Sequence, residues 1–187
     1  MEWDHFDYSK VKEIQERFLP QNEVVSFVAL KDGESLLDVG AGDGHYSLMF
    51  ATPNPNSKIT AIEIGLNGAK RIKEMISQSK LGNIRILEED ACVKRDYSNY
   101  DIIFFSTVFH DLDCREELVR SMSETMHDGA RVVFIEFKKD ADVGPPAHIR
   151  ISEIELRDIM ERNGFNLVDS KGMEFHYMHK YIIKQKK

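Results

Sequence analysis

Asp38–Gly44, with the sequence DVGAGDG, follows the apolar pair Leu36-Leu37 and leads into His45–Phe50. This order predicts a buried strand, then a glycine-rich turn, then the start of a helix. Glycine adopts positive φ and lets a ligand come close to the backbone. The amide groups of the first helical turn lack partners within the helix and face the same place. We therefore expect a nucleoside-sized ligand to lie on this turn.

The spacing of the glycines distinguishes two classes of cofactor. A dinucleotide-binding turn has the pattern G-x-G-x-x-G. Counted from Gly40, its third glycine would fall at position 45, which is His45. The pattern found is acidic-x-Gly-x-Gly-x-Gly, so a nicotinamide-dependent oxidoreductase is the less favoured interpretation.

Three more β-rich runs follow, each with polar residues at or just after its end. Lys58–Ile64 contains Glu63, about 20 residues beyond the turn, where a βαβ unit places a carboxylate on ribose hydroxyls. The alternative for Glu63 is a solvated acid at a strand end. Asn83–Ala91 and Tyr100–Ser106 are the third and fourth predicted strands. Alternation of strands with helical patterns predicts an α/β fold with a parallel sheet.

The last strands should break the parallel pattern. Arg131–Phe137 is almost entirely apolar and predicts a central fifth strand. Asn166–Asp169 and Tyr177–Ile183 are the sixth and seventh, and only seven residues, Ser170–His176, separate them. Parallel neighbours need a crossover of roughly a dozen residues, so this pair is predicted to be an antiparallel hairpin.

Helix boundaries are indicated by caps and breakers. Before the first strand, helical patterns cover Tyr8–Phe18 and Asn22–Leu30. Two pairs have capping-box spacing, Asp113 with Glu116 and Ser152 with Glu155. In the helix after Ser152, four apolar residues are expected to contact the core: Ile154, Leu156, Ile159 and Met160. The irregular stretch Lys139–Ile151 follows the fifth strand and is expected to be an active-site lid.

Taken together, these features resemble the class I S-adenosylmethionine-dependent methyltransferases, in particular the small type 11 group that includes the ubiquinone/menaquinone C-methyltransferases. The resemblance runs from about residue 33 to the end of the sequence. It implies a Rossmann-like three-layer α/β/α sandwich with a mostly parallel seven-stranded sheet and an antiparallel last strand. It also implies one domain over residues 1–187, with residues 1–31 as an N-terminal helical cap.

The resemblance implies S-adenosyl-L-methionine as cofactor and gives roles to particular residues. Glu63 would bind the ribose hydroxyls, and Asp90 would accept from the adenine amino group. The active site would open after the fourth strand, where His110 is the candidate catalytic base or, equally, a structural histidine. The implied cofactor-binding residues are Asp38, Gly40, Ala41, Gly42, Gly44, Glu63, Ile64, Asp90, Ala91 and Ser106.

The absence of certain motifs limits the classes of methyl acceptor that the sequence allows. The Asn/Asp-Pro-Pro-aromatic motif of enzymes that methylate adenine or glutamine nitrogen is replaced by Ser106–Phe109. The two cysteines, Cys92 and Cys114, lack the proline-cysteine context of cytosine C5 methylation, and the acidic residues show no convincing metal-ligand spacing. We therefore expect a small-molecule acceptor with a nucleophilic O, N or activated C. A methyltransferase acting on protein or RNA, or a non-catalytic cofactor-binding module, is the alternative.

The amino-acid composition limits the kinds of partner that we expect this protein to bind. The 187 residues are 42% hydrophobic and 30% charged, and 25 basic against 32 acidic residues give a net charge of −7, which disfavours nucleic acid. No apolar run approaches the roughly 20 residues of a membrane helix, and the N-terminus lacks the pattern of a signal peptide. Two cysteines predict no disulfide framework, and a cytoplasmic location is expected. The sequence does not indicate an oligomeric state.

Overall fold

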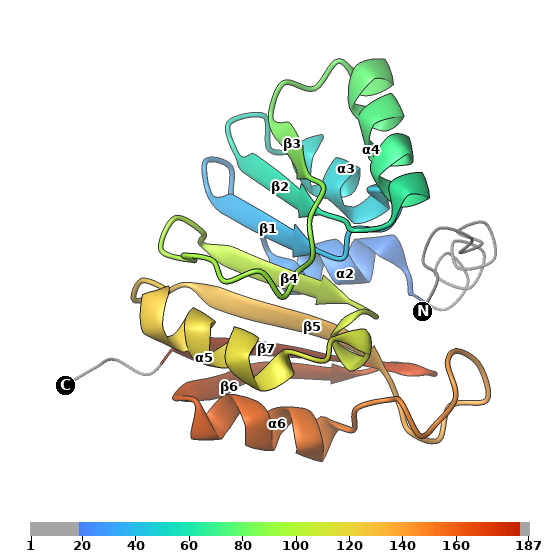
Figure 1. Cartoon of the computed structure of the whole chain (residues 1–187), viewed down its shortest axis with the longest axis vertical. Helices are drawn as coiled ribbons and strands as arrows, with labels where there is room; N and C mark the ends of the chain where they lie inside the picture. Colours follow the sequence, from blue (N-terminus) through green and yellow to red (C-terminus); the bar gives the residue numbers. More distant parts are fainter. Residues whose placement is uncertain (1–18, 184–187) are drawn as a thin grey trace. The chain divides into compact units, whose positions relative to one another are not determined.

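The computed structural model describes residues 19–183, and the chain divides into two compact units, residues 1–91 and 92–187. The first unit contains three strands, β1 (Ser35–Val39), β2 (Lys58–Ile62) and β3 (Ile84–Leu87). It also contains three described helices, α2 (Gln21–Val28), α3 (His45–Ala51) and α4 (Leu66–Ser79). All of these are visible in Figure 1. The strand, glycine turn and helix predicted around residues 38–44 are thus present.

Parallel pairing aligns the strands of the first unit. Ser35 lies opposite Lys58 and Val39 opposite Ile62, and β2 pairs with β3 in the same parallel sense. The three carboxyl ends therefore lie at one edge of the sheet. Helices α3 and α4 contact β2 and β3. This arrangement brings the ends of β1, β2 and β3 together, which is where the sequence predicts the ligand.

The second unit contains four strands, β4 (Ile102–Ser106), β5 (Arg131–Phe137), β6 (Phe165–Gly172) and β7 (His176–Ile183). Its helices are the 3-10 turn η2 (Phe109–Asp111), α5 (Arg115–Thr125) and α6 (Glu153–Arg162). Strands β4 and β5 are parallel, whereas β7 is antiparallel to both β5 and β6. The predicted hairpin is confirmed, and it contains an irregularity between Leu167 and Asp169.

The seven strands belong to one sheet with the order β3-β2-β1-β4-β5-β7-β6, and β7 is the strand that reverses direction. The predicted α/β class, with a mostly parallel seven-stranded sheet and an antiparallel last strand, is confirmed. Of the predicted N-terminal helical cap, the pattern Tyr8–Phe18 lies outside the described residues. The pattern Asn22–Leu30 forms α2, which ends with Ala29 in the left-handed conformation at φ 53°.

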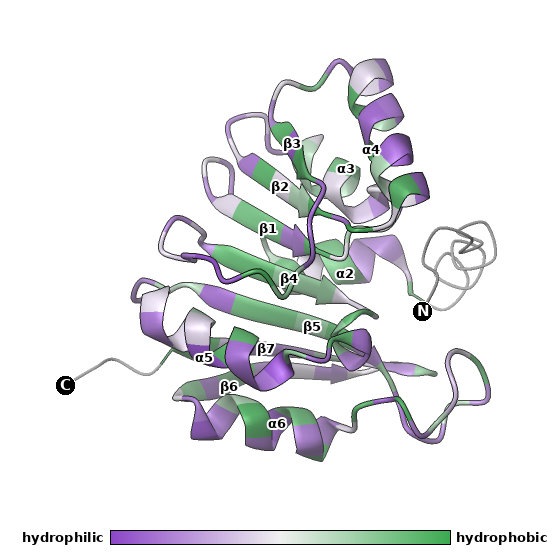
Figure 2. Cartoon of the chain, viewed as in Figure 1, coloured by the Kyte–Doolittle hydropathy of each residue, from purple (hydrophilic) through white to green (hydrophobic). Residues whose placement is uncertain are grey.

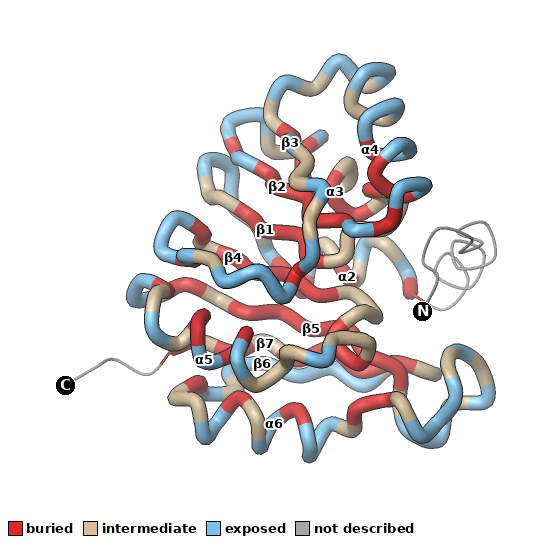
Figure 3. Tube along the Cα trace, viewed as in Figure 1, coloured by how far each residue is buried: buried red, intermediate tan, exposed pale blue. Residues whose placement is uncertain are grey.

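The core of the second unit is built on β4 and β5, which Figure 2 shows as mostly hydrophobic and Figure 3 as mostly buried. The rings of Phe105 and Phe134 stack with centroids 4.9 Å apart. The Phe109 ring meets Phe134 edge-on, also at 4.9 Å. Phe109, at the start of η2, is fully buried. It therefore fixes η2 against the sheet and does not line an open pocket.

The start of α6 follows its sequence signal, whereas the start of α5 does not. The Ser152 hydroxyl accepts from the Glu155 amide at 3.2 Å, and the Glu155 carboxylate accepts from the Ser152 amide at 2.7 Å, forming the predicted capping box. The box predicted for Asp113 and Glu116 is wrong, because α5 is capped by Cys114 without a side-chain hydrogen bond.

One predicted core contact of α6 is also wrong. Leu156 and Met160 are buried, and they lie four residues apart on the same face of the helix. Ile154 is 74% exposed. At about 100° per residue, it lies two residues and therefore about 200° away from Leu156. Its side chain consequently points to the face opposite the core, and Ile159 is half-buried between the two faces.

Cys92 and Cys114 form a disulfide, so the prediction that the two cysteines provide no disulfide framework is wrong. The segment after Cys92 also binds α5. The Arg95 carbonyl accepts from the Ser121 hydroxyl at 3.0 Å, and the Tyr97 amide donates to the Thr125 hydroxyl at 3.0 Å. The expected cytoplasmic location rested partly on unpaired cysteines, and that support is removed. Within residues 19–183, no helix is both long and apolar enough to cross a membrane.

The disulfide should stabilise the fold. The cysteines are 22 positions apart, and closing a loop of this size restricts the unfolded chain. Replacing both, as Cys92→Ser with Cys114→Ser, should lower the free energy of unfolding by about 3 kcal/mol. Urea denaturation of the double variant and of the oxidised wild type measures the difference. The wild type in excess dithiothreitol is the matched control and should resemble the variant. Equal unfolding midpoints in all three samples would contradict the prediction.

Candidate functional site

The glycine turn after β1 has the backbone that its sequence predicts. Gly40, Gly42 and Gly44 have φ values of 66°, 60° and 82°. The Ala41 amide donates to the Ile62 carbonyl at 2.9 Å, which ties the turn to the end of β2. A Cβ on Gly44 would lie 2.9 Å from the branched side chain of Ile72 in α4. Gly44 is therefore required for helix packing, in addition to the positive φ that it shares with the other two glycines.

The Glu63 carboxylate, directly after β2, holds this turn from the other side. One oxygen accepts from the Gly42 amide at 2.8 Å and the other from the Gly65 amide at 2.7 Å. Glu63 is only 7% exposed. Burial raises its pKa, and the two amide hydrogen bonds oppose that rise. A carboxylate oxygen has two acceptor sites, so each oxygen can also accept from a ligand hydroxyl.

Asp38 supports the turn from beneath. Its carboxylate accepts from the Ser47 hydroxyl of α3 at 2.6 Å, and the residue is 2% exposed. Burial raises its pKa to about 7. These contacts link the end of β1 to the first turn of α3. Asp38 therefore fixes the backbone on which a ligand would lie, and its predicted contact with the cofactor stays a prediction.

The other predicted residues of the first unit stand at the carboxyl ends of the same strands. Ile64 follows Glu63 and is more than half exposed. Asp90 is exposed beyond the end of β3, and Ala91 next to it is buried. Since β2 and β3 are parallel, these residues lie along the edge that carries the glycine turn. The edge thus offers exposed apolar and acidic groups beside a carboxylate held by the backbone.

In the second unit, the end of β4 also has a constrained backbone. Thr107 has φ 52°, which is uncommon for a residue with a side chain, and its amide donates to the Ile135 carbonyl at 2.7 Å. The Ser106 hydroxyl before it is buried and has no hydrogen-bond partner among the described residues. An unsatisfied buried hydroxyl at the carboxyl end of a parallel strand suits a polar ligand group.

His110 lies in η2 and pairs with a residue that the sequence did not single out. Its Nδ1 donates to the Glu136 carboxylate at 2.6 Å. The other oxygen of Glu136 accepts from the backbone amides of Phe109 at 2.8 Å and His110 at 3.4 Å. Glu136 is fully buried on β5. The one sequence signal was an acid inside the otherwise apolar run Val132–Phe137.

The charges around His110 decide its protonation. Burial alone would lower the pKa of His110, which is 7% exposed. The hydrogen bond and charge of Glu136, together with the charge of Asp111, outweigh burial and the opposing charge of Arg115 and raise the pKa of His110 above 6.5. The Nε2 atom lies 3.4 Å from the Asp111 carboxylate. With Nδ1–H given to Glu136, Nε2 is the nitrogen that remains available to exchange a proton.

The predicted lid after β5 is organised around one arginine. Arg150 is 7% exposed. Its guanidinium donates to the backbone carbonyls of Lys138, Lys139, Ala141, Val143 and Pro145. Gly144, at φ 98°, packs so closely on Phe137 that a Cβ would lie 2.5 Å from the ring. The loop is thus internally bonded, and its movement as a lid stays a prediction. His148, in the same loop, is exposed.

No group of three or more His, Cys, Asp or Glu side chains suited to a metal ion occurs within residues 19–183. The candidate residues fall into two groups, each described within its own unit. The first unit holds the glycine turn and Glu63. The second holds Ser106 and the His110–Glu136 pair.

Comparison with known proteins gives a family match. The family described as "Methyltransferase domain" matches residues 37–132, just over half of the chain. The sequence is 32% identical over 108 residues to (S)-coclaurine N-methyltransferase from Thalictrum flavum subsp. glaucum, covering 57% of this chain and 29% of that protein. It is 25% identical over 116 residues to malonyl-(acyl-carrier protein) O-methyltransferase 2 from Ilyobacter polytropus, covering 60% of this chain and 44% of that protein.

A solved structure supports the fold over nearly the whole chain. The crystal structure of a SAM dependent methyltransferase from Aquifex aeolicus superposes with a TM-score of 0.83. The alignment covers 95% of this chain and 99% of that one, at 24% identity. By contrast, the chain spans less than half the length of the two curated relatives, so their substrates do not transfer to it directly.

Proposed function

Because the chain belongs to this methyltransferase-domain family, we propose that it transfers a methyl group from S-adenosyl-L-methionine to a small-molecule acceptor. The family match confirms the resemblance that the glycine turn and strand order predicted. The two curated relatives bear the names of an N- and an O-methyltransferase. The observation that carries the proposal is the Glu63 carboxylate, which the amides of Gly42 and Gly65 hold at the edge of the sheet.

The first unit fits the nucleoside part of this cofactor. The two carboxylate oxygens of Glu63 would accept from vicinal ribose hydroxyls, and the positive-φ turn carries no side chain at Gly40 or Gly42. We assign the adenine amino group to Asp90, with Ile64 and Ala91 beside the ring. Asp38, Ala41 and Gly44 would fix the backbone of the turn. Ser106 would form a hydrogen bond to the cofactor with its unpartnered hydroxyl. The cofactor supplies an activated methyl group on a sulfonium.

The second unit would supply the proton acceptor. We propose that His110 removes a proton from the acceptor through Nε2. Glu136 is a positioning residue, because it accepts a hydrogen bond from the Nδ1–H group of His110 and so fixes the tautomer of the imidazole. The same carboxylate accepts hydrogen bonds from two backbone amides of η2. These bonds hold the imidazole in a fixed position relative to β5. The alternative is that this network only anchors η2, and the pH dependence of the reaction distinguishes the two.

The cofactor assignment predicts a specific loss of affinity in Glu63→Gln. The amide keeps the shape of the side chain but loses its charge, and hydrogen bonds to charged groups contribute about 1.5–3 kcal/mol. S-adenosylhomocysteine should therefore bind roughly 10- to 150-fold more weakly by calorimetry. Glu74→Gln, an exposed acid on α4, is the matched control and should bind as the wild type does. NAD should bind to none of the three. Unchanged affinity in a folded Glu63→Gln protein refutes the assignment.

The catalytic role predicts a pH profile. Transfer of radiolabelled methyl groups to the small-molecule fraction of a cell extract gives a rate without a known acceptor. The wild-type rate should fall as pH drops through a pKa above 6.5, since a protonated imidazole cannot accept a proton. Glu136→Gln should move this inflection to lower pH, because burial then dominates the His110 pKa. His110→Asn should lower the rate by about 10²- to 10⁴-fold and leave S-adenosylhomocysteine affinity unchanged.

Three results would count against this proposal. A His110→Asn enzyme with wild-type turnover would make the histidine structural. Label appearing in the protein or RNA fraction instead of the small-molecule fraction would favour a macromolecular acceptor. Cofactor binding without transfer to any fraction would favour the non-catalytic module.

A further inference from the structure

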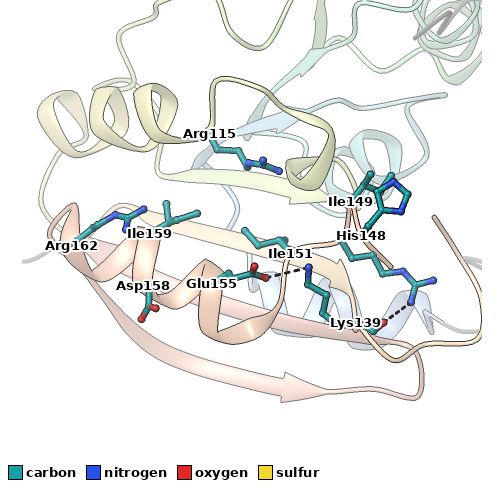
Figure 4. A pocket seen from close by; sticks show the side chains of 10 residues that line it. Arg115, Lys139, His148, Ile149, Ile151, Glu155, Asp158, Ile159 and Arg162 are labelled. Carbon is teal, nitrogen blue, oxygen red and sulfur yellow. Dashed lines mark hydrogen bonds and ion pairs between the residues drawn. The ribbon is translucent and has the colours of Figure 1, made fainter. Parts of the chain in front are cut away.

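A pocket of about 330 Å³ lies in the second unit, between the first turn of α5, the loop after β5 and one side of α6. Figure 4 shows the side chains that enclose it. Three of them are isoleucines, Ile149, Ile151 and Ile159. Charged side chains, including Arg115 and Arg150, line the remainder. The pocket therefore combines an apolar surface with cationic groups.

Three of the six Lys, Arg, Asp and Glu side chains that line this pocket form ion pairs. Lys139 contacts the Glu155 carboxylate at 3.5 Å, the ion pair drawn as a dashed line in Figure 4. Arg162 is bound to the Glu116 carboxylate of α5. Asp158 points away from Arg115 in the same view. Among these side chains, the charge that no ion pair offsets is that of Asp158.

In the described part of the chain, two guanidinium groups have no such direct ion pair, although the charge of Asp111 interacts with Arg115. Among the described residues, neither Arg115 nor Arg150 has a carboxylate within ion-pair distance. Arg150 spends its donors on backbone carbonyls. Arg115 donates one N–H, from Nη1, to the His110 carbonyl at 2.8 Å. A guanidinium has five N–H groups in a planar fork, so Arg115 retains donors for a second partner.

The position of Arg115 connects the pocket to the candidate base. Its contact with the His110 carbonyl places it directly against η2, which follows the carboxyl end of β4. Ligands of open α/β sheets bind outside the carboxyl ends of the strands. A molecule whose anionic end pairs with Arg115 would therefore extend along the same edge of the second unit on which His110 lies.

We propose that this pocket binds a carboxylate carried by the methyl acceptor. Arg115 is the residue that recognises it, and the isoleucines contact the adjoining hydrocarbon. A planar carboxylate matches the free donors of the guanidinium better than a neutral amide, and the charge of Arg150 adds to the attraction. The substrate class is thus a small organic acid with an apolar body. This assignment rests on the proposed methyl transfer and deepens it.

Hexanoate and hexanamide, which share a shape and differ in charge, test the proposal on the full chain. Titration is followed by the isoleucine δ-methyl signals in NMR spectra. Hexanoate should shift the signals of Ile149, Ile151 and Ile159 in a saturable manner. Hexanamide should bind at least tenfold more weakly. Arg115→Gln should reduce the affinity for hexanoate to that for hexanamide.

Arg120→Gln, on the same helix, is the control for the loss of one charge from an exposed arginine, and it should bind hexanoate as the wild type does. Arg115→Lys keeps the positive charge and should retain a preference for hexanoate over hexanamide. That result would show that the loss in Arg115→Gln does not come from misfolding. Equal affinities for hexanoate and hexanamide in the wild type would overturn the proposal, as would unshifted isoleucine signals. S-adenosylhomocysteine binding is measured on the wild type and on each variant. A wild type that does not bind S-adenosylhomocysteine would refute the proposed function and leave the result for the pocket intact.

Discussion

The carboxylate of Glu63, held by two backbone amides, is the interaction on which the candidate site depends. Its bonds to Gly42 and Gly65 join the turn after β1 to the turn after β2. Without an acceptor there, the buried Gly65 amide and the partly buried Gly42 amide would lose their partner, and a buried unsatisfied group costs about 1–3 kcal/mol. The same bonds fix both carboxylate oxygens at the edge where the parallel strands end. One side chain thus both stabilises the turn and fixes the carboxylate oxygens that a ligand would contact.

The second unit repeats this device with Glu136. One oxygen of this buried carboxylate binds the amides that begin η2, and the other binds His110. A third case uses a cation, because Arg150 gathers the carbonyls of the loop after β5. In each case an irregular segment at a strand end is ordered by a buried charged group that satisfies backbone partners. Such segments carry function because the regular strands beside them are rigid.

The sequence predicted what depends on local pattern. The glycine turn, the position of Glu63, the capping box at Ser152 and the hairpin of β6 and β7 all follow from spacing along the chain. It failed where a contact joins residues far apart. Cys92 and Cys114 pair because the segment after β3 runs along α5, which no spacing rule indicates. Arg150 was overlooked because its hydrogen-bond partners are backbone carbonyls, which have no sequence signature, and Glu136 because its side-chain partner His110 lies 26 positions away. Ile154 was misplaced because hydrophobicity alone does not specify a face of the helix.

The central claim is that Glu63 serves both the turn and the ribose, and a crystal structure with S-adenosylhomocysteine tests it most directly. The account predicts a ribose hydroxyl within about 3 Å of each Glu63 carboxylate oxygen. It also predicts that the bonds to the Gly42 and Gly65 amides persist in the complex. A ribose bound elsewhere, with Glu63 contacting only backbone amides, would contradict the account.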